Sequence, residues 1–171
     1  MLTAILLAYS SPAAPLRRDA VARSLASLVD SCVQGLVADA VLAGAPGAGL
    51  DRIADEAGCA LVESAAAAEG LAQALAIARR DHVFLLAAGA AVERGFVDEI
   101  NDAFAYGAQD RAMVLRLAPH SLLTRMAPNF SEAVGVIAPR AAVRAGGGAD
   151  LARLSKRLRC AELTCRARRT F

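Results

Sequence analysis

The sequence has few aromatic residues and no tryptophan. Aromatic side chains make up 4 % of its 171 residues, which leaves little material for stacking bases or sugar rings. There are two histidines, and the four cysteines include no C-x-x-C pair, which excludes the common zinc-finger spacings. We expect the cysteines to be free thiols of a cytosolic protein. They are Cys32, Cys59, Cys160 and Cys165.

Long apolar runs are missing as well. Hydrophobic residues make up 56 % of the chain and the mean hydropathy is +0.41. Charged residues nevertheless interrupt every stretch before it reaches the length of a bilayer span. The apolar segment 1–9 lacks a basic leader, so it predicts a buried strand and not a secretory signal. We therefore expect a cytoplasmic protein.

Short apolar runs alternate with amphipathic runs along the chain. The expected strands are 2–8, 38–43, 59–63, 83–86, 113–117, 134–138 and, at an edge of the sheet, 160–165. The expected helices are 19–33, 50–57, 66–80, 97–104, 121–126, 141–145 and 151–158. This alternation predicts an α/β fold, a doubly wound, mostly parallel sheet with helices on both faces. We expect a single domain with two halves, 1–106 and 107–171.

Residues 87–91 follow the most apolar of the expected strands. They therefore lie at the carboxyl edge of the sheet, where open α/β sheets bind their ligands. The five residues are Ala, Ala, Gly, Ala and Ala. None of them carries a carboxylate, imidazole, thiol or hydroxyl group, so this loop offers no side chain for catalysis or metal binding.

Basic residues gather towards the C-terminal end, although the net charge of the chain is only +2. They are Arg153, Lys156, Arg157, Arg159, Arg166, Arg168 and Arg169. Two interpretations stay open: a solvated helix face with a frayed tail, or a contact surface formed by the arginines from Arg157 onward. The second predicts a protein partner, a second copy of the chain, or an anionic membrane surface. Nucleic acid is not expected, because no nucleic-acid-binding motif accompanies the charge.

Several local phrases occur in a characteristic order. They are residues 24–29 (SLASLV), 35–43 (GLVADAVLA), 53–59 (IADEAGC), 72–81, 84–96, 153–158 and 163–168. In this order they resemble the family 2 glycosyltransferases of the GT-A fold, in particular the small bacterial members. The resemblance implies a Rossmann-like sheet that binds a nucleotide-sugar at the carboxyl ends of its first strands. Ala8 and Tyr9 end the first of these strands.

The resemblance also implies where carboxylates should stand. The acids that bind the nucleoside fall at Ala43 and Ala48. The Asp-x-Asp motif that holds Mg²⁺ or Mn²⁺ against the diphosphate falls at Ala87 and Gly89. The acidic pair that deprotonates the acceptor hydroxyl falls just before the last helix, where Asp150 is the one acid that remains.

These losses favour a glycosyltransferase-like domain that has no metal cofactor and serves as a companion or binding subunit. Backbone N–H groups of the loop 44–49 remain as candidates for holding a phosphate. Two alternatives stay open. One is an active, metal-independent glycosyltransferase with Asp150 as base, although Asp150 is also expected to be a helix N-cap. The other is a nucleotidyltransferase-like enzyme, but residues 9–18 lack the glycine and lysine of that loop.

Overall fold

The computed structural model describes residues 1–10, 15–119 and 131–170. Its strands are β1 (Leu2–Ala8), β2 (Val37–Gly44), β3 (Ala60–Glu63), β4 (His82–Ala87), β5 (Ala90–Val92), β6 (Met113–Leu117), β7 (Ala133–Pro139) and β8 (Ala161–Arg169). Its helices are α1 (Arg18–Ala26), α2 (Val29–Val33), α3 (Asp51–Ala57), α4 (Ala67–Ile77), α5 (Phe96–Ala105), α7 (Arg140–Gly146) and α8 (Leu151–Arg157), with the short 3-10 helix η1 (Ala108–Asp110). None of the described helices is long and apolar enough to cross a membrane.

The strands form one eight-stranded sheet in the order β3-β2-β1-β4-β7-β6-β8-β5. Strands β1 to β4 are mutually parallel where they pair, whereas β7 runs antiparallel to both β4 and β6. The carboxyl ends of β1 and β4 therefore share one edge with the beginning of β7. Every residue of β1 is buried, as expected for a central parallel strand with both faces covered.

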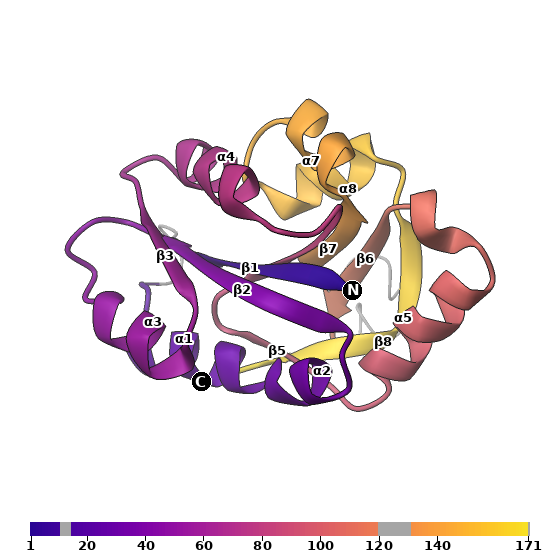
Figure 1. The fold of residues 1–171 in the computed structure, drawn as a ribbon, viewed down its shortest axis with the longest axis horizontal. Coiled ribbons are helices and arrows are strands. Elements are labelled where there is room, and N and C mark those ends of the chain that lie inside the picture. The colour runs from indigo at the N-terminus through magenta and orange to yellow at the C-terminus, as the bar shows by residue number, and fades with distance from the viewer. Residues whose placement is uncertain (11–14, 120–130, 171) are drawn as a thin grey trace.

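Helices cover both faces of this sheet (Figure 1). Helices α4, α7 and α8 lie on one face, and α1, α2, α3 and α5 lie on the other. Alternate residues of β1 divide between two apolar clusters: Leu6 packs with α1 and α5, and Ile5 packs with α4 and α8. The predicted α/β class, with its mostly parallel sheet, is confirmed.

The C-terminal strand differs from the prediction. Strand β8 extends to Arg169 and lies between β6 and β5, so the predicted edge position and the frayed tail are both wrong. The edge strand on this side of the sheet is β5, which begins inside the predicted loop 87–91 and ends one residue beyond it. Arginines conceal the strand pattern of β8, but Leu163 and Ala167 are buried against the core while Arg168 remains exposed. A three-residue strand such as β5 forms only because β8 pairs with it.

The helix predicted over 19–33 is two helices, α1 and α2, with a break at residues 27–28. At the break the Ser27 hydroxyl donates to the Ser24 carbonyl (2.7 Å) and accepts from the Val92 N–H (3.2 Å). Such local side-chain hydrogen bonds compete with the helical ladder. The other predicted helices occur with shifted ends, and the one expected over 121–126 lies outside the described residues.

Helix α5 is attached to β8 through one carboxylate. Glu99 accepts hydrogen bonds from the N–H groups of Thr164 (2.6 Å) and Cys165 (2.8 Å) and from the Thr164 hydroxyl (2.8 Å). Partial burial acts to raise the pKa of Glu99, but these hydrogen bonds outweigh it and hold the pKa below its ordinary value. Burial of Cys165, together with the hydrogen bond and the negative charge of Glu99, raises the pKa of the Cys165 thiol to about 12.

Glu99→Gln should lower the free energy of unfolding at neutral pH by roughly 1 kcal/mol, because the hydrogen bonds lose their ionic acceptor. The folded-state pKa lies below the ordinary 4.5. The wild-type carboxylate therefore stabilises the fold above that pH, and its contribution is lost as the pH falls through the folded-state pKa. Urea unfolding of both proteins between neutral and acid pH measures this. The exposed Glu93→Gln is the control, and equal pH slopes in all three proteins would contradict the assignment.

Candidate functional site

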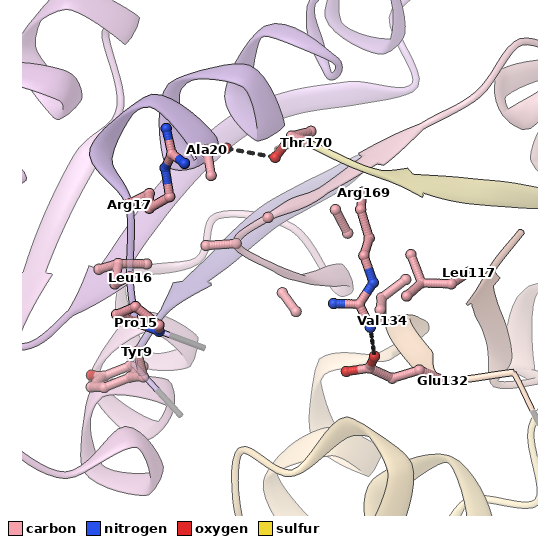
Figure 2. Close-up of a pocket in the computed structure, with 14 residues that line it drawn as sticks. Tyr9, Pro15, Leu16, Arg17, Ala20, Leu117, Glu132, Val134, Arg169 and Thr170 are labelled. Atoms are coloured by element: carbon pink, nitrogen blue, oxygen red, sulfur yellow. Dashed lines mark hydrogen bonds and ion pairs between the residues drawn. The ribbon is translucent and has the colours of Figure 1, made fainter. Parts of the chain in front are cut away.

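A cavity of about 410 Å³ lies at the carboxyl edge of β1 and β4 (Figure 2). Segments far apart in the sequence line it because each ends or begins at this edge. The lining residues are Tyr9, Pro15, Leu16, Arg17, Ala20, Ala87, Ala88, Gly89, Ala90, Leu117, Glu132, Val134, Arg169 and Thr170. Its position is the one at which open α/β sheets bind ligands.

The turn between β4 and β5 forms the floor of this cavity and is fixed by the protein itself. Gly89 has a φ of +91°, which a side chain rarely permits. Its N–H donates to the Ser24 hydroxyl (3.0 Å), and its carbonyl accepts from the Thr170 N–H (2.9 Å). The Ala20 carbonyl accepts from both hydroxyls, that of Ser24 (2.9 Å) and that of Thr170 (3.2 Å). The turn is therefore held between α1 and the end of β8.

Three charged side chains line the cavity among the residues described. Arg169 Nη2 lies 2.7 Å from Glu132 Oε2, and Figure 2 shows these two side chains meeting across one wall. Arg17 stands on the other wall and forms two hydrogen bonds with Asp19 (3.1 and 3.0 Å). Sequence analysis missed Glu132. The signal would have been a carboxylate just before a strand, but only the antiparallel direction of β7 brings that end to this edge.

The cavity does not fit the divalent metal that the resemblance implies. Mg²⁺ and Mn²⁺ require several oxygen ligands, and the expected positions Ala87 and Gly89 carry none in their side chains. Among the described residues that line the cavity, the single carboxylate is that of Glu132, and it already pairs with Arg169. No group of three acids, histidines or cysteines suited to a metal occurs in the part of the chain that the structure describes.

The predicted nucleotide-binding positions Ala43 and Ala87 lie on the two sides of β1 at the same register, but only some of the predicted positions line the cavity. Tyr9, Ala87 and Gly89 line the cavity, whereas Ala8 and Ala43 are fully buried in the core. Tyr9 turns its hydroxyl against α4, where burial first and the charge of Glu69 second raise its pKa. A Cβ on Gly70 would clash with that hydroxyl, so any other residue there would displace the Tyr9 side chain.

The glycine-rich loop 44–49 is covered by Arg18. The Arg18 Nε donates to the Ala48 carbonyl (3.2 Å), and a Cβ on Gly49 would lie 2.7 Å from the guanidinium. The Ala48 N–H donates to the Ala45 carbonyl (3.3 Å), so this N–H is engaged within the loop. Ala48 does not line the cavity, and the loop remains a phosphate site only as a prediction.

Asp150 is the N-cap of α8. Its carboxylate accepts from the Arg153 N–H (3.0 Å) and lies 3.2 Å from the Arg153 Nε. This confirms the expected cap. Asp150 does not line the cavity, and its role as a catalytic base stays a prediction.

The predicted basic surface is divided between elements. Arg157 on α8 donates to the Gly146 carbonyl (2.7 Å), and Arg166 lies 4.0 Å from Glu162. Arg168 and Arg169 end the strand β8, whereas Arg157 stands on α8, which covers one face of the sheet (Figure 1). Arg159 follows α8 with a positive φ of 49°. The five arginines therefore do not share one surface.

Ser24→Ala should lower the free energy of unfolding by about 1 to 3 kcal/mol, because it leaves the Gly89 N–H of the turn without its partner. Ser155→Ala is the matched control. Ser155 is equally buried in a helix, but its hydroxyl bonds only the Ala152 carbonyl of the same helix. Thermal or urea unfolding measures both variants, and equal losses would show that the turn does not depend on Ser24.

Asp150→Asn should be nearly neutral for stability because asparagine also caps helices well, whereas Asp150→Ala should cost about 1 kcal/mol. Urea denaturation of the two variants tests the cap. A large loss in Asp150→Asn would mean that the carboxylate charge has a further task in the folded protein.

Comparisons with known proteins identify the fold. No protein-family model and no curated protein sequence matches the chain. Solved structures of glucosyl-3-phosphoglycerate synthase from Mycobacterium tuberculosis are similar. The complex with Mn²⁺, uridine diphosphate and glucosyl-3-phosphoglycerate superposes with a TM-score of 0.64 at 16 % identity, covering 94 % of this chain and 68 % of that one. The complex with phosphoglyceric acid gives a TM-score of 0.63 at 15 % identity, covering 92 % and 66 %.

This chain thus spans about two thirds of the length of the mycobacterial enzyme. Structural similarity at this level of sequence identity shows the fold and does not show the activity. The sheet order, the position of the cavity and these superpositions agree with one another. The chain has the GT-A, glycosyltransferase-like fold.

Proposed function

We propose that this chain is a glycosyltransferase-like domain that binds a ligand or a companion protein and does not transfer sugar through a metal-bound nucleotide. One observation carries the proposal: the turn Ala87–Gly89 has no acid at the metal-binding positions, and the polar backbone groups of Gly89 are engaged by Ser24 and Thr170. In this proposal the turn joins α1 to β8 and does not bind a ligand.

The charge balance of the cavity supports the same conclusion. Departure of a nucleoside diphosphate requires countercharge at the phosphates, which a divalent cation supplies in a metal-dependent transferase. Solved structures of the mycobacterial enzyme hold Mn²⁺ together with uridine diphosphate. Here the described residues with charged groups at the cavity are Arg17, Glu132 and Arg169, and the Glu132 carboxylate pairs with Arg169.

The two enzymatic alternatives have less support. A metal-independent transferase needs a base beside the acceptor, but Asp150 is bonded to Arg153 and stands outside the residues that line the cavity. A nucleotidyltransferase needs a glycine-rich loop after the first strand, and the described part of that loop has none. Glu132 would be the carboxylate to replace if turnover were found.

A companion role requires a partner. The partner we propose is a protein, which includes the case of a second copy of this chain. The location we propose is the cytoplasm. Association with an anionic membrane surface is the alternative location. The scarcity of aromatic residues and the lack of a nucleic-acid-binding motif in the sequence argue against nucleic acid.

Calorimetric titration with uridine-diphosphate-glucose, in Mn²⁺ and in a chelator, tests the proposal. We expect no metal-dependent heat and no change in melting temperature on chelation, because the described lining of the cavity has no carboxylate that is not paired with an arginine. The mycobacterial enzyme, solved with Mn²⁺ and this sugar nucleotide, is the positive control. Mn²⁺-dependent micromolar binding, or glucosyl transfer that Asp150→Asn abolishes, would refute the loss of function.

A further inference from the structure

The two layers of helices on this sheet carry opposite charge. Helices α4, α7 and α8 on one face (Figure 1) hold five basic residues and one acid, Glu69. Helices α1, α2, α3 and α5 on the other face hold eight acids and three arginines. We call α4, α7 and α8 the basic layer. We propose that the basic layer is the surface by which this protein attaches to an anionic membrane.

The helices of the basic layer are joined to one another. Helix α7 contacts both α4 and α8. The Arg140 guanidinium at the start of α7 donates to the Ala78 carbonyl at the end of α4 (2.5 Å). The Arg157 guanidinium on α8 donates to the Gly146 carbonyl at the end of α7 (2.7 Å). The exposed sides of the three helices therefore form one continuous surface with a fixed arrangement of charge.

Several cations of this surface are not neutralised by the protein. Five exposed basic residues take part in no ion pair within residues 1–10, 15–119 and 131–170. They are Arg79 and Arg80 after α4, Arg144 on α7, Lys156 on α8 and Arg159 after α8. The acids Asp81 and Asp150 of the same segments pair with two further arginines, Arg140 (3.7 Å) and Arg153 (3.2 Å). The surface therefore keeps a positive charge.

The helices of this layer are amphipathic in the sense that suits a membrane surface. On α8, Leu151 and Leu154 are buried against the core while Lys156 is exposed. Ile77 in the last turn of α4 is 47 % exposed, directly before the two free arginines. An apolar side chain beside basic ones is typical of helices that lie at a lipid headgroup layer, where the cations meet the anionic lipids and the apolar group enters the acyl boundary.

A membrane fits this charge distribution better than a second copy of the chain does. A planar anionic surface can face all the free cations at once, and it repels the acidic helices on the other face of the sheet, so both layers favour one orientation. The acidic layer of a second copy would also attract the basic layer. Such a head-to-tail contact repeats without closing unless the rotation happens to form a ring. Attachment to a membrane does not depend on what the cavity at the carboxyl edge binds, so it goes beyond the proposed function.

Sedimentation with vesicles tests the proposal on the whole chain. The protein should bind phosphatidylcholine vesicles that contain phosphatidylserine at low salt, and should not bind vesicles of phosphatidylcholine alone. The double variant Arg144→Gln/Lys156→Gln should bind about twentyfold more weakly, because each cation near an anionic surface strengthens binding about fivefold. Salt at roughly 0.1 M should weaken binding by the wild type, because charges are then screened beyond about 10 Å.

The matched control is the double variant Arg94→Gln/Arg168→Gln. It removes the same net charge from two exposed arginines outside the basic layer and should bind as the wild type does. Both double variants should keep the wild-type melting temperature, since the four side chains are exposed. The proposal is overturned if the anionic vesicles do not bind, if neutral vesicles bind equally, or if the control weakens binding as much. It is also overturned if sedimentation without vesicles shows association between copies of the chain that Arg144→Gln/Lys156→Gln disrupts.

Discussion

The turn at Ala88 and Gly89 is the constraint on which the rest of the ligand-binding edge depends. The Gly89 N–H donates to the hydroxyl of Ser24 on α1, and the Gly89 carbonyl accepts from the Thr170 N–H at the end of β8. The Ala20 carbonyl then joins α1 to β8 through the hydroxyls of Ser24 and Thr170. Buried backbone groups need such partners. A glycine is required because the turn has a positive φ.

This arrangement places the C-terminal strand in the site. Because Thr170 bonds Gly89, β8 passes beside the turn, and the register then places Arg169 at the cavity. Carboxylates at the turn would face this guanidinium group and form ion pairs with it before they met a metal.

The sequence predicted the structure well where a segment is apolar enough to be buried whatever its neighbours are. The apolar runs of β1 and β4 predicted a parallel sheet because both faces of a central strand must be apolar. The alanine and glycine at positions 87 and 89 correctly located the edge where the cavity lies. The positions of the short β5 and the charged β8 in the sheet could not be predicted from the sequence, since these two strands pair with each other. Glu132 was missed for the same reason, because its position depends on the direction of β7.

The position of the charges also explains why a basic C-terminal end need not be a tail. In the sequence, the arginines from Arg157 onward read as one cluster, but a strand separates its neighbours by face and a helix separates them by angle. Arg157 donates to the Gly146 carbonyl at the end of α7, and Arg166 lies beside Glu162. Of the arginines from Arg157 onward, Arg169 lines the cavity at the carboxyl edge of the sheet. The strand register thus decides which arginines stand together, because it sets the face and the neighbours of each side chain.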